Sequence, residues 1–208
     1  TPVPQHGTPP KPHDDVFGKH TTHLSTADAT GNWVALTQTI NTAFGSKVII
    51  PGTGVIMNDE MDDFSVQPGI PNAFKLIGAE ANSVQPGKRP LSSMSPTLVL
   101  KHGKPLITVG AAGGPTIITQ TVQALVGIID LGKAPAESLA LPRIHHQWAP
   151  DSLKIETKFG DDVLKELEAR GHTLERSSGF GACQCIQLRD GLLYPAHDPR
   201  VPGKADGF

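Results

Sequence analysis

The stretch TTHLSTADATGNWVALTQTI, residues 21–40, decides the fold class of this chain. Threonine and aliphatic residues, which favour β-strands, lie on both sides of a turn signal at residues 29–32, where Gly31 is followed by Asn32. The stretch therefore predicts a β-hairpin whose first strand begins at Thr21.

The 20 residues before Thr21 have a different character. They contain five prolines and no hydrophobic periodicity, which is typical of an extended and exposed linker. We therefore expect residues 1–20 to form a proline-rich linker and residues 21–208 to form one folded domain. The change between them falls at the His20–Thr21 bond.

Later segments alternate strand pairs with helices. Two strands are expected around a turn at residues 102–103, and a final hairpin around residues 190–191. Residues 115–132 begin with proline and end with glycine, and they predict a largely buried helix. A second, amphipathic helix is predicted over residues 161–171. Its apolar stripe consists of Val163, Leu164 and Leu167. This order indicates a layered α+β fold with an antiparallel sheet.

The region between the hairpin and these elements is rich in proline, glycine and asparagine. Residues 46–64 predict a strand that is interrupted at residues 51–54 and ends in an acidic loop. Residues 65–90 predict a long loop of the kind that acts as a lid or a binding element.

Composition excludes several classes of protein. The chain has 208 residues, 38% apolar and 18% charged, with a net charge of −2 and no apolar run long enough to cross a bilayer. We expect neither nucleic acid nor anionic lipid as a partner, because the basic residues are scattered. Cys183 and Cys185 alternate along a predicted strand and are hard to bridge, so we interpret them as small core residues.

Thr21 is a candidate nucleophile. A hydroxyl needs a nearby base, and cleavage before Thr21 would free an α-amino group whose pKa of about 7.7–8.0 suits that task. The same hydroxyl would make the cut by attacking the carbonyl carbon of His20, and water would then hydrolyse the ester. The alternative is that Thr21 and Thr22 are simply β-forming residues at the start of a strand.

Three further segments contain residue types that such chemistry uses. Gly113 and Gly114, between a strand and a helix, are candidates for an oxyanion site, or only for a tight turn. Ser92 and Ser93 are candidate hydrogen-bond donors to a carboxylate; the alternative is that their hydroxyls only bond to nearby backbone groups. An acidic loop is a candidate site for an ammonium group or calcium, or is only solvated. It contains Asp59, Glu60, Asp62 and Asp63. We interpret the adjacent His145 and His146 as structural, since their spacing does not aim both at one metal.

The order of these motifs resembles the small, carboxy-terminal subunit of γ-glutamyltranspeptidase. The segments that carry the resemblance run from Thr21 to the end of the chain. They are TTHLS, DATGNWVALTQTINTAFGS, NDEMDDFS, GKRPLSSMSPT, AAGGPTIIT, PRIHHQW and AHDPR. The resemblance implies the N-terminal-nucleophile hydrolase fold, a four-layer αββα sandwich, and a precursor that cuts itself before the threonine.

The resemblance also implies a role for each site residue. Thr21 would be the nucleophile and Thr39 would hold its hydroxyl. Asn41, Glu60 and Asp63 would bind the α-amino group of a γ-glutamyl substrate. Ser92 and Ser93 would hold the α-carboxylate, and Gly113 and Gly114 would form the oxyanion hole. A large subunit from the same precursor would supply an arginine for the carboxylate.

Three features depart from the family pattern. Phe74, in the lid-like loop, stands where many bacterial members have tyrosine, and Glu60 stands where some have glutamine. Residues 1–20 still precede the nucleophile, as in an unprocessed or partly trimmed precursor or a fragment that begins within a longer linker.

The expected function is γ-glutamyl transfer from, or hydrolysis of, glutathione and related compounds, with water, amino acids or peptides as acceptors. No metal or organic cofactor is implied, and the location expected from the resemblance is periplasmic or secreted. Two alternatives remain open. One is a glutaryl-type or polyglutamate acylase or acyltransferase on the same fold, and the other is an uncleaved, silent homologue that binds or scaffolds.

Overall fold

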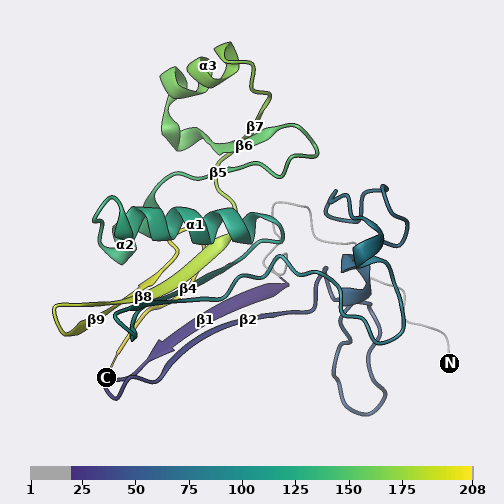
Figure 1. The fold of residues 1–208 in the computed structure, drawn as a ribbon, viewed down its shortest axis with the longest axis horizontal. Coiled ribbons are helices and arrows are strands. Elements are labelled where there is room, and N and C mark those ends of the chain that lie inside the picture. The colour runs from purple at the N-terminus through teal and green to yellow at the C-terminus, as the bar shows by residue number, and fades with distance from the viewer. Residues whose placement is uncertain (1–19, 208) are drawn as a thin grey trace.

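Two antiparallel sheets lie face to face at the centre of the structure, a computed structural model that describes residues 20–207. The smaller sheet pairs β1 (Thr21–Ala27) with β2 (Trp33–Thr39). The larger has the order β3 (Thr97–Lys101), β4 (Lys104–Ala112), β8 (Ala182–Arg189) and β9 (Leu192–His197). Helices α1 (Thr116–Ile129) and α2 (Pro135–Ala140) cover the other face of the larger sheet (Figure 1). The predicted linker lies outside the described residues, apart from His20.

The hairpin predicted at residues 21–40 is confirmed. Asp28 stabilises its turn, because one carboxylate oxygen accepts from the amides of both Thr30 and Asn32 at 2.9 Å. The pairing register places Thr21 opposite Thr39, at the open end of the hairpin. The residues that begin β1 and end β2 therefore lie side by side.

The strand pairs expected around residues 102–103 and 190–191 are also confirmed. All four turn residues have a positive φ, which suits tight hairpin turns. The core forms where β4 and β8 pack against α1, as expected for two apolar faces that exclude water. It includes Cys183 and Cys185, which are free thiols at 0% and 1% exposure. Burial raises the pKa of Cys183 to about 12, consistent with an unreactive core residue.

Three expectations about buried strands and helices were wrong. Residues 46–64 contain no strand, only an isolated bridge between Ile49 and Ile56, because Pro51 and the glycines beside it turn the chain there. The helix α1 is buried on one face only; Val122 on the other face is 52% exposed. The predicted amphipathic helix does form, as α3 (Asp161–Ala169), but of its apolar stripe Leu164 is buried whereas Val163 is exposed.

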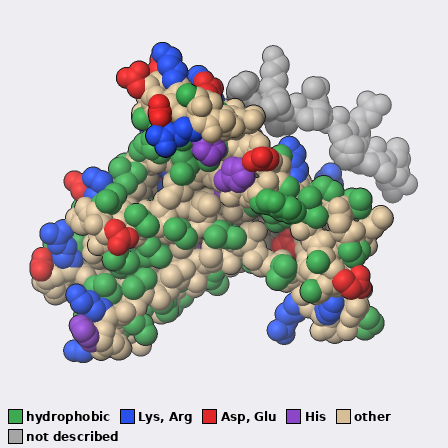
Figure 2. Space-filling model, turned by 45° about the horizontal axis from the view of Figure 1, so that its top comes forward, with side chains coloured by type: hydrophobic (Ala, Val, Ile, Leu, Met, Phe, Trp, Pro, Cys, Tyr) green, Lys and Arg blue, Asp and Glu red, His purple; other side chains and the backbone are tan. Residues whose placement is uncertain are grey.

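A third sheet, which the sequence reading missed, lies beyond α1 (Figure 1). It consists of β5 (Ile144–His145), β6 (Leu153–Glu156) and β7 (Leu174–Ser177), and β6 pairs with β7 in parallel. The long segment between β2 and β3, residues 40–96, is a loop with short 3-10 helices, including Glu60–Asp63. Figure 2 shows many apolar side chains on one face of the molecule. No helix among residues 20–207 is long and apolar enough to span a membrane.

Candidate active site

A cavity of about 340 Å³ opens where β1 begins and α1 starts, beside the long loop. Every residue that the sequence reading selected for chemistry through the family resemblance lines it. These residues are His20, Thr21, Thr39, Asn41, Glu60, Asp63, Phe74, Ser92, Ser93, Gly113 and Gly114. Tertiary structure thus brings together residues that span 95 positions of the chain, from His20 to Gly114.

The hydroxyls of Thr21 and Thr39 form the centre of the site. Their Oγ1 atoms lie 2.8 Å apart. Thr39 Oγ1 also accepts from the amide of Asn41 at 2.8 Å and donates to the carbonyl oxygen of His20 at 3.1 Å. Because Thr39 has one proton and gives it to His20, Thr21 is the donor in the threonine pair. Thr39 therefore draws the Thr21 proton away from the oxygen that would act as nucleophile.

The carbonyl of His20 is held by two donors. Besides Thr39 Oγ1, the amide of Ile40 donates to it at 3.2 Å. Both donors stabilise negative charge on this oxygen, which makes the carbonyl carbon a better electrophile. The peptide bond before Thr21 is therefore held next to the Thr21 hydroxyl in a polarising environment.

Gly113 and Gly114 join β4 to α1. They have φ values of 134° and 58°, which favour glycine. A side chain at Gly113 would also meet Thr116 Oγ1 at 2.7 Å. Within the described part of the chain, neither glycine amide donates a hydrogen bond. Both amides are therefore available to an anion at the N-terminal end of the 14-residue helix α1.

Glu60 and Asp63 form a pair of carboxyl groups with raised pKa values. Burial is the main cause for both groups; the neighbouring charge of Asp63 adds to the shift at Glu60, and the charge of Asp59 to that at Asp63. Glu60 Oε1 is buried without a hydrogen-bond partner among residues 20–207. An arriving ammonium group would satisfy that oxygen and offset the repulsion.

The other members of the acidic loop have different positions. Asp59 accepts from both the amide and the hydroxyl of Thr42, and its backbone carbonyl accepts from Asn41 Nδ2 at 3.2 Å. It therefore holds the loop, and Asp62 is exposed. No group of three metal-binding side chains capable of holding an ion occurs in the described residues. Ser92 Oγ accepts from the amide of Met94 at 3.1 Å, which leaves its own proton free for a ligand.

Phe74 lies against Gly114, with ring atoms 3.4 Å from where a Cβ on Gly114 would be. Its backbone carbonyl accepts from Gln147 Nε2 at 3.0 Å. Gln147 is in turn bonded to His145 Nε2 at 3.0 Å. The lid-like loop is therefore fixed through its backbone, without a side-chain hydroxyl at position 74.

The sequence reading missed several residues around the site. One of them is Gln147. The two histidines interpreted as structural have different settings: His145 is buried, and His146 bonds to the exposed Asp151 at 3.1 Å. His23 was also missed, although it alternates with Thr21 along the strand and so faces the same side. Its ring covers Gly110, and burial lowers its pKa to about 4.

Paired threonine hydroxyls beside a polarised peptide bond, with free amides at a helix start, are the arrangement that acyl transfer through a hydroxyl requires. The setting of this arrangement in stacked antiparallel sheets is that of the N-terminal-nucleophile hydrolases. The family profile described as Gamma-glutamyltranspeptidase matches residues 5–208, and the chain belongs to that family. The match takes in most of the proline-rich tract as well as the folded domain.

Individual proteins similar to this chain are members of the same family. The chain is 49% identical, over 181 residues, to the glutathione hydrolase proenzyme of Escherichia coli; the match covers 86% of this chain but only 31% of that protein. The structure is similar to a threonine-to-alanine mutant of Helicobacter pylori γ-glutamyltranspeptidase, with a TM-score of 0.82, 43% identity and coverage of 86% and 100% of the two chains. It is also similar to the Pseudomonas nitroreducens enzyme complexed with L-DON, with a TM-score of 0.85, 40% identity and coverage of 90% and 99%.

Proposed function

We propose that this chain is the catalytic, nucleophile-bearing part of an enzyme that transfers or hydrolyses γ-glutamyl groups, with glutathione as a substrate. The pair of Glu60 and Asp63 beside Thr21 carries this proposal. An α-ammonium group is the part of a γ-glutamyl compound that such a pair recognises, and both carboxyl groups line the same cavity as the nucleophile.

The first step is self-cleavage. Thr21 Oγ1 attacks the carbonyl carbon of His20 and its proton passes toward Thr39, while the developing oxyanion is held by the two donors already on that oxygen. The acyl group moves from nitrogen to oxygen as the C–N bond breaks, the proton from Thr21 Oγ1 ends on the departing Thr21 nitrogen, and water hydrolyses the resulting ester to leave a carboxylate on His20. This frees the α-amino group of Thr21, which becomes a base on the same residue as the nucleophile.

The second step is acyl transfer. The neutral α-amino group accepts the hydroxyl proton as Thr21 attacks the γ-carbonyl, and it donates that proton to the leaving amine. Gly113 and Gly114 would hold the oxyanion, Ser92 and Ser93 the α-carboxylate, and Asn41 would join Glu60 and Asp63 around the ammonium group. Water, an amino acid or a peptide then accepts the γ-glutamyl group from the ester.

The rest of the precursor completes this enzyme in the proposal. The chain spans about a third of the E. coli relative it matches. We propose that a large subunit from the same precursor packs against it and supplies an arginine for the α-carboxylate. We also propose a periplasmic or secreted location, which export of a tagged full-length precursor followed by fractionation would test.

Two measurements test the proposed function. The full-length precursor should yield a fragment that begins at Thr21, seen by intact mass, and Thr21→Ala should remain one chain. The processed protein should prefer a γ-glutamyl anilide over a glutaryl anilide by about 10- to 100-fold, because the latter lacks the ammonium group. Equal rates on the two anilides would favour the acylase alternative. An uncleaved wild-type chain with no turnover would favour the silent homologue.

A further inference from the structure

The two glycine amides of the site have their directions set by the carbonyl groups of the same peptide planes. In a trans peptide the C=O and the N–H point in opposite directions. Whatever holds the carbonyl of Ala112 therefore directs the amide of Gly113, and whatever holds the carbonyl of Gly113 directs the amide of Gly114. Glycines have no side chain to resist rotation of these planes, so an outside contact has to fix them.

Two side chains of α1 make those contacts. Gln120 Nε2 donates to the Ala112 carbonyl at 3.1 Å. Thr116 Oγ1 donates to the Gly113 carbonyl at 2.8 Å, a shorter contact than that of the Thr116 backbone amide, which donates to the same oxygen at 3.3 Å. The two side chains are also joined to each other, because Gln120 Nε2 donates to Thr116 Oγ1 at 2.8 Å. Each glycine amide thus has its own side-chain donor on the opposite edge of the peptide.

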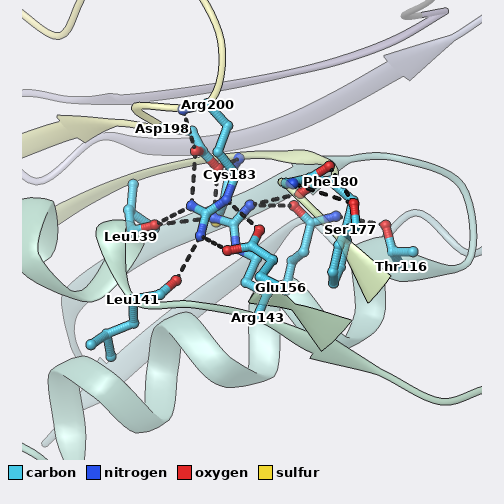
Figure 3. A network of polar contacts seen from close by, with 12 residues as sticks. Thr116, Leu139, Leu141, Arg143, Glu156, Ser177, Phe180, Cys183, Asp198 and Arg200 are labelled. Carbon is cyan, nitrogen blue, oxygen red and sulfur yellow. Dashed lines mark hydrogen bonds and ion pairs between the residues drawn. The ribbon is translucent and has the colours of Figure 1, made fainter. Parts of the chain in front are cut away.

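Gln120 is itself held by a buried group of charged residues, of which Figure 3 shows Arg143 and Asp198. Its Oε1 accepts from Arg143 Nη1 at 3.2 Å. Arg143 pairs with Asp198 at 2.5 Å, and Asp198 is fully buried. Because an arginine only donates and a carbonyl only accepts, these partners allow one orientation of the Gln120 amide.

The packing leaves Gln120 no alternative position. It is 1% exposed, and a Cβ on Gly181 would lie 2.1 Å from its Nε2. A Cβ on Gly113 would lie 3.1 Å from the same nitrogen. The side-chain amide is therefore enclosed between two glycines, next to the loop that it holds.

We propose that Thr116 and Gln120 are positioning residues for acyl transfer, Thr116 for the amide of Gly114 and Gln120 for the amide of Gly113. This inference rests on the proposed function, since it concerns the oxyanion of that reaction. It does not extend to self-cleavage, because the His20 carbonyl is held by Thr39 and Ile40 instead. Neither Thr116 nor Gln120 has to touch the substrate to act in this way.

The test uses the full-length precursor and four variants: Thr116→Val, Thr116→Ser, Gln120→Met and Thr121→Val. Thr116→Val keeps the shape and the 3.3 Å bond from the backbone amide but removes the hydroxyl donor at 2.8 Å, and Thr116→Ser restores that donor. Thr121→Val is the matched control, because this buried hydroxyl on the same helix has no hydrogen-bond partner among the described residues. Deleting an oxyanion donor outright costs about 100- to 1,000-fold in kcat, so releasing one to rotate should cost about tenfold.

In Thr116→Val we expect kcat on γ-glutamyl-p-nitroanilide to fall about tenfold with KM unchanged. The affinity for a glutamate analogue with a boronic acid in place of the γ-carboxylate should fall by the same factor, since its adduct with Thr21 mimics the tetrahedral intermediate. Inhibition by glutamate and the rate of self-cleavage should not change. Thr116→Ser and Thr121→Val should match the wild type, and Gln120→Met should behave like Thr116→Val.

Each other outcome overturns the inference. Wild-type kcat and boronate affinity in Thr116→Val would exclude a positioning role. A rise in KM together with weaker glutamate binding and slower self-cleavage, all by the same factor as the fall in kcat, would also exclude it, because it would indicate general disruption of the site. If Gln120→Met does not fold, the Thr116→Val and Thr116→Ser pair decides. A wild-type protein that is inactive on the anilide would overturn the proposed function, and this inference with it.

Discussion

The hydroxyl oxygens of Thr21 and Thr39 lie 2.8 Å apart because the two residues are opposite partners at the open end of one hairpin. Thr39 Oγ1 accepts a hydrogen bond from Thr21 and donates one to the carbonyl oxygen of His20. In the proposed self-cleavage, one side chain thus acts both on the nucleophile and on the carbonyl that it attacks. This relationship predicts that Thr39 matters for cleavage and for turnover alike.

Thr39→Val should slow both self-cleavage and turnover by about 100-fold, because valine keeps the shape but cannot exchange a proton. Thr39→Ser should stay close to the wild type. Thr26→Val, an exposed position of β1, serves as the control. Intact mass over time and anilide kinetics measure the two rates, and wild-type rates in Thr39→Val would contradict the assignment.

Glu60→Gln should extend activity to lower pH at the expense of affinity. The pKa of Glu60 is raised by burial and by the charge of Asp63, so in the wild type Glu60 takes up a proton early as the pH falls and loses its hold on the ammonium group. Glutamine has no such titration, so the acid limb of kcat/KM should move to lower pH. At neutral pH, KM should rise about tenfold, because a charged hydrogen-bond acceptor is lost. An unmoved acid limb would show that another group controls it.

His23 should make the fold sensitive to mild acid. Burial lowers its pKa from 6.5 to about 4, so the unfolded chain binds a proton between these values while the folded chain does not. The stabilisation is complete above pH 6.5, is lost as the pH falls from 6.5 to 4, and is constant below 4. His23→Gln should therefore flatten the dependence of Tm on pH in this window. Both proteins should carry Thr21→Ala so that cleavage does not change the species, and parallel pH curves would reject the prediction.

Gln147→Leu should free the lid-like loop. Gln147 is bonded to the carbonyl of Phe74 at 3.0 Å, and the loss of one such bond, worth about 1 kcal/mol, should raise the open population about fivefold. Amide hydrogen exchange of residues 72–78 would measure this directly. His146→Leu is the control, because His146 bonds to Asp151 and not to the loop. Unchanged exchange in Gln147→Leu would mean that other contacts fix the loop.

Much of the fold follows from local patterns in the sequence. The turns at Asp28 and Asp190 and the glycines beside them determine where the hairpins reverse, and alternation along β8 places both cysteines in the core. The strand expected at residues 46–64 does not form because the chain turns at Pro51 and Gly52, so that only one bridge, between Ile49 and Ile56, joins its two apolar arms. The third sheet was missed because its strands are short and one pairing joins segments about 20 residues apart.

The sequence by itself determined that Thr21 begins a strand after a proline-rich tract, and the order of its motifs identified the family. Only the tertiary structure decided which residues act on one another. Thr39 reaches Thr21 through strand register, and Thr116 and Gln120 reach the glycine loop because α1 packs back over β4. The physical reason is that propensity and periodicity are local, whereas hydrogen bonds at 3 Å depend on how distant segments pack.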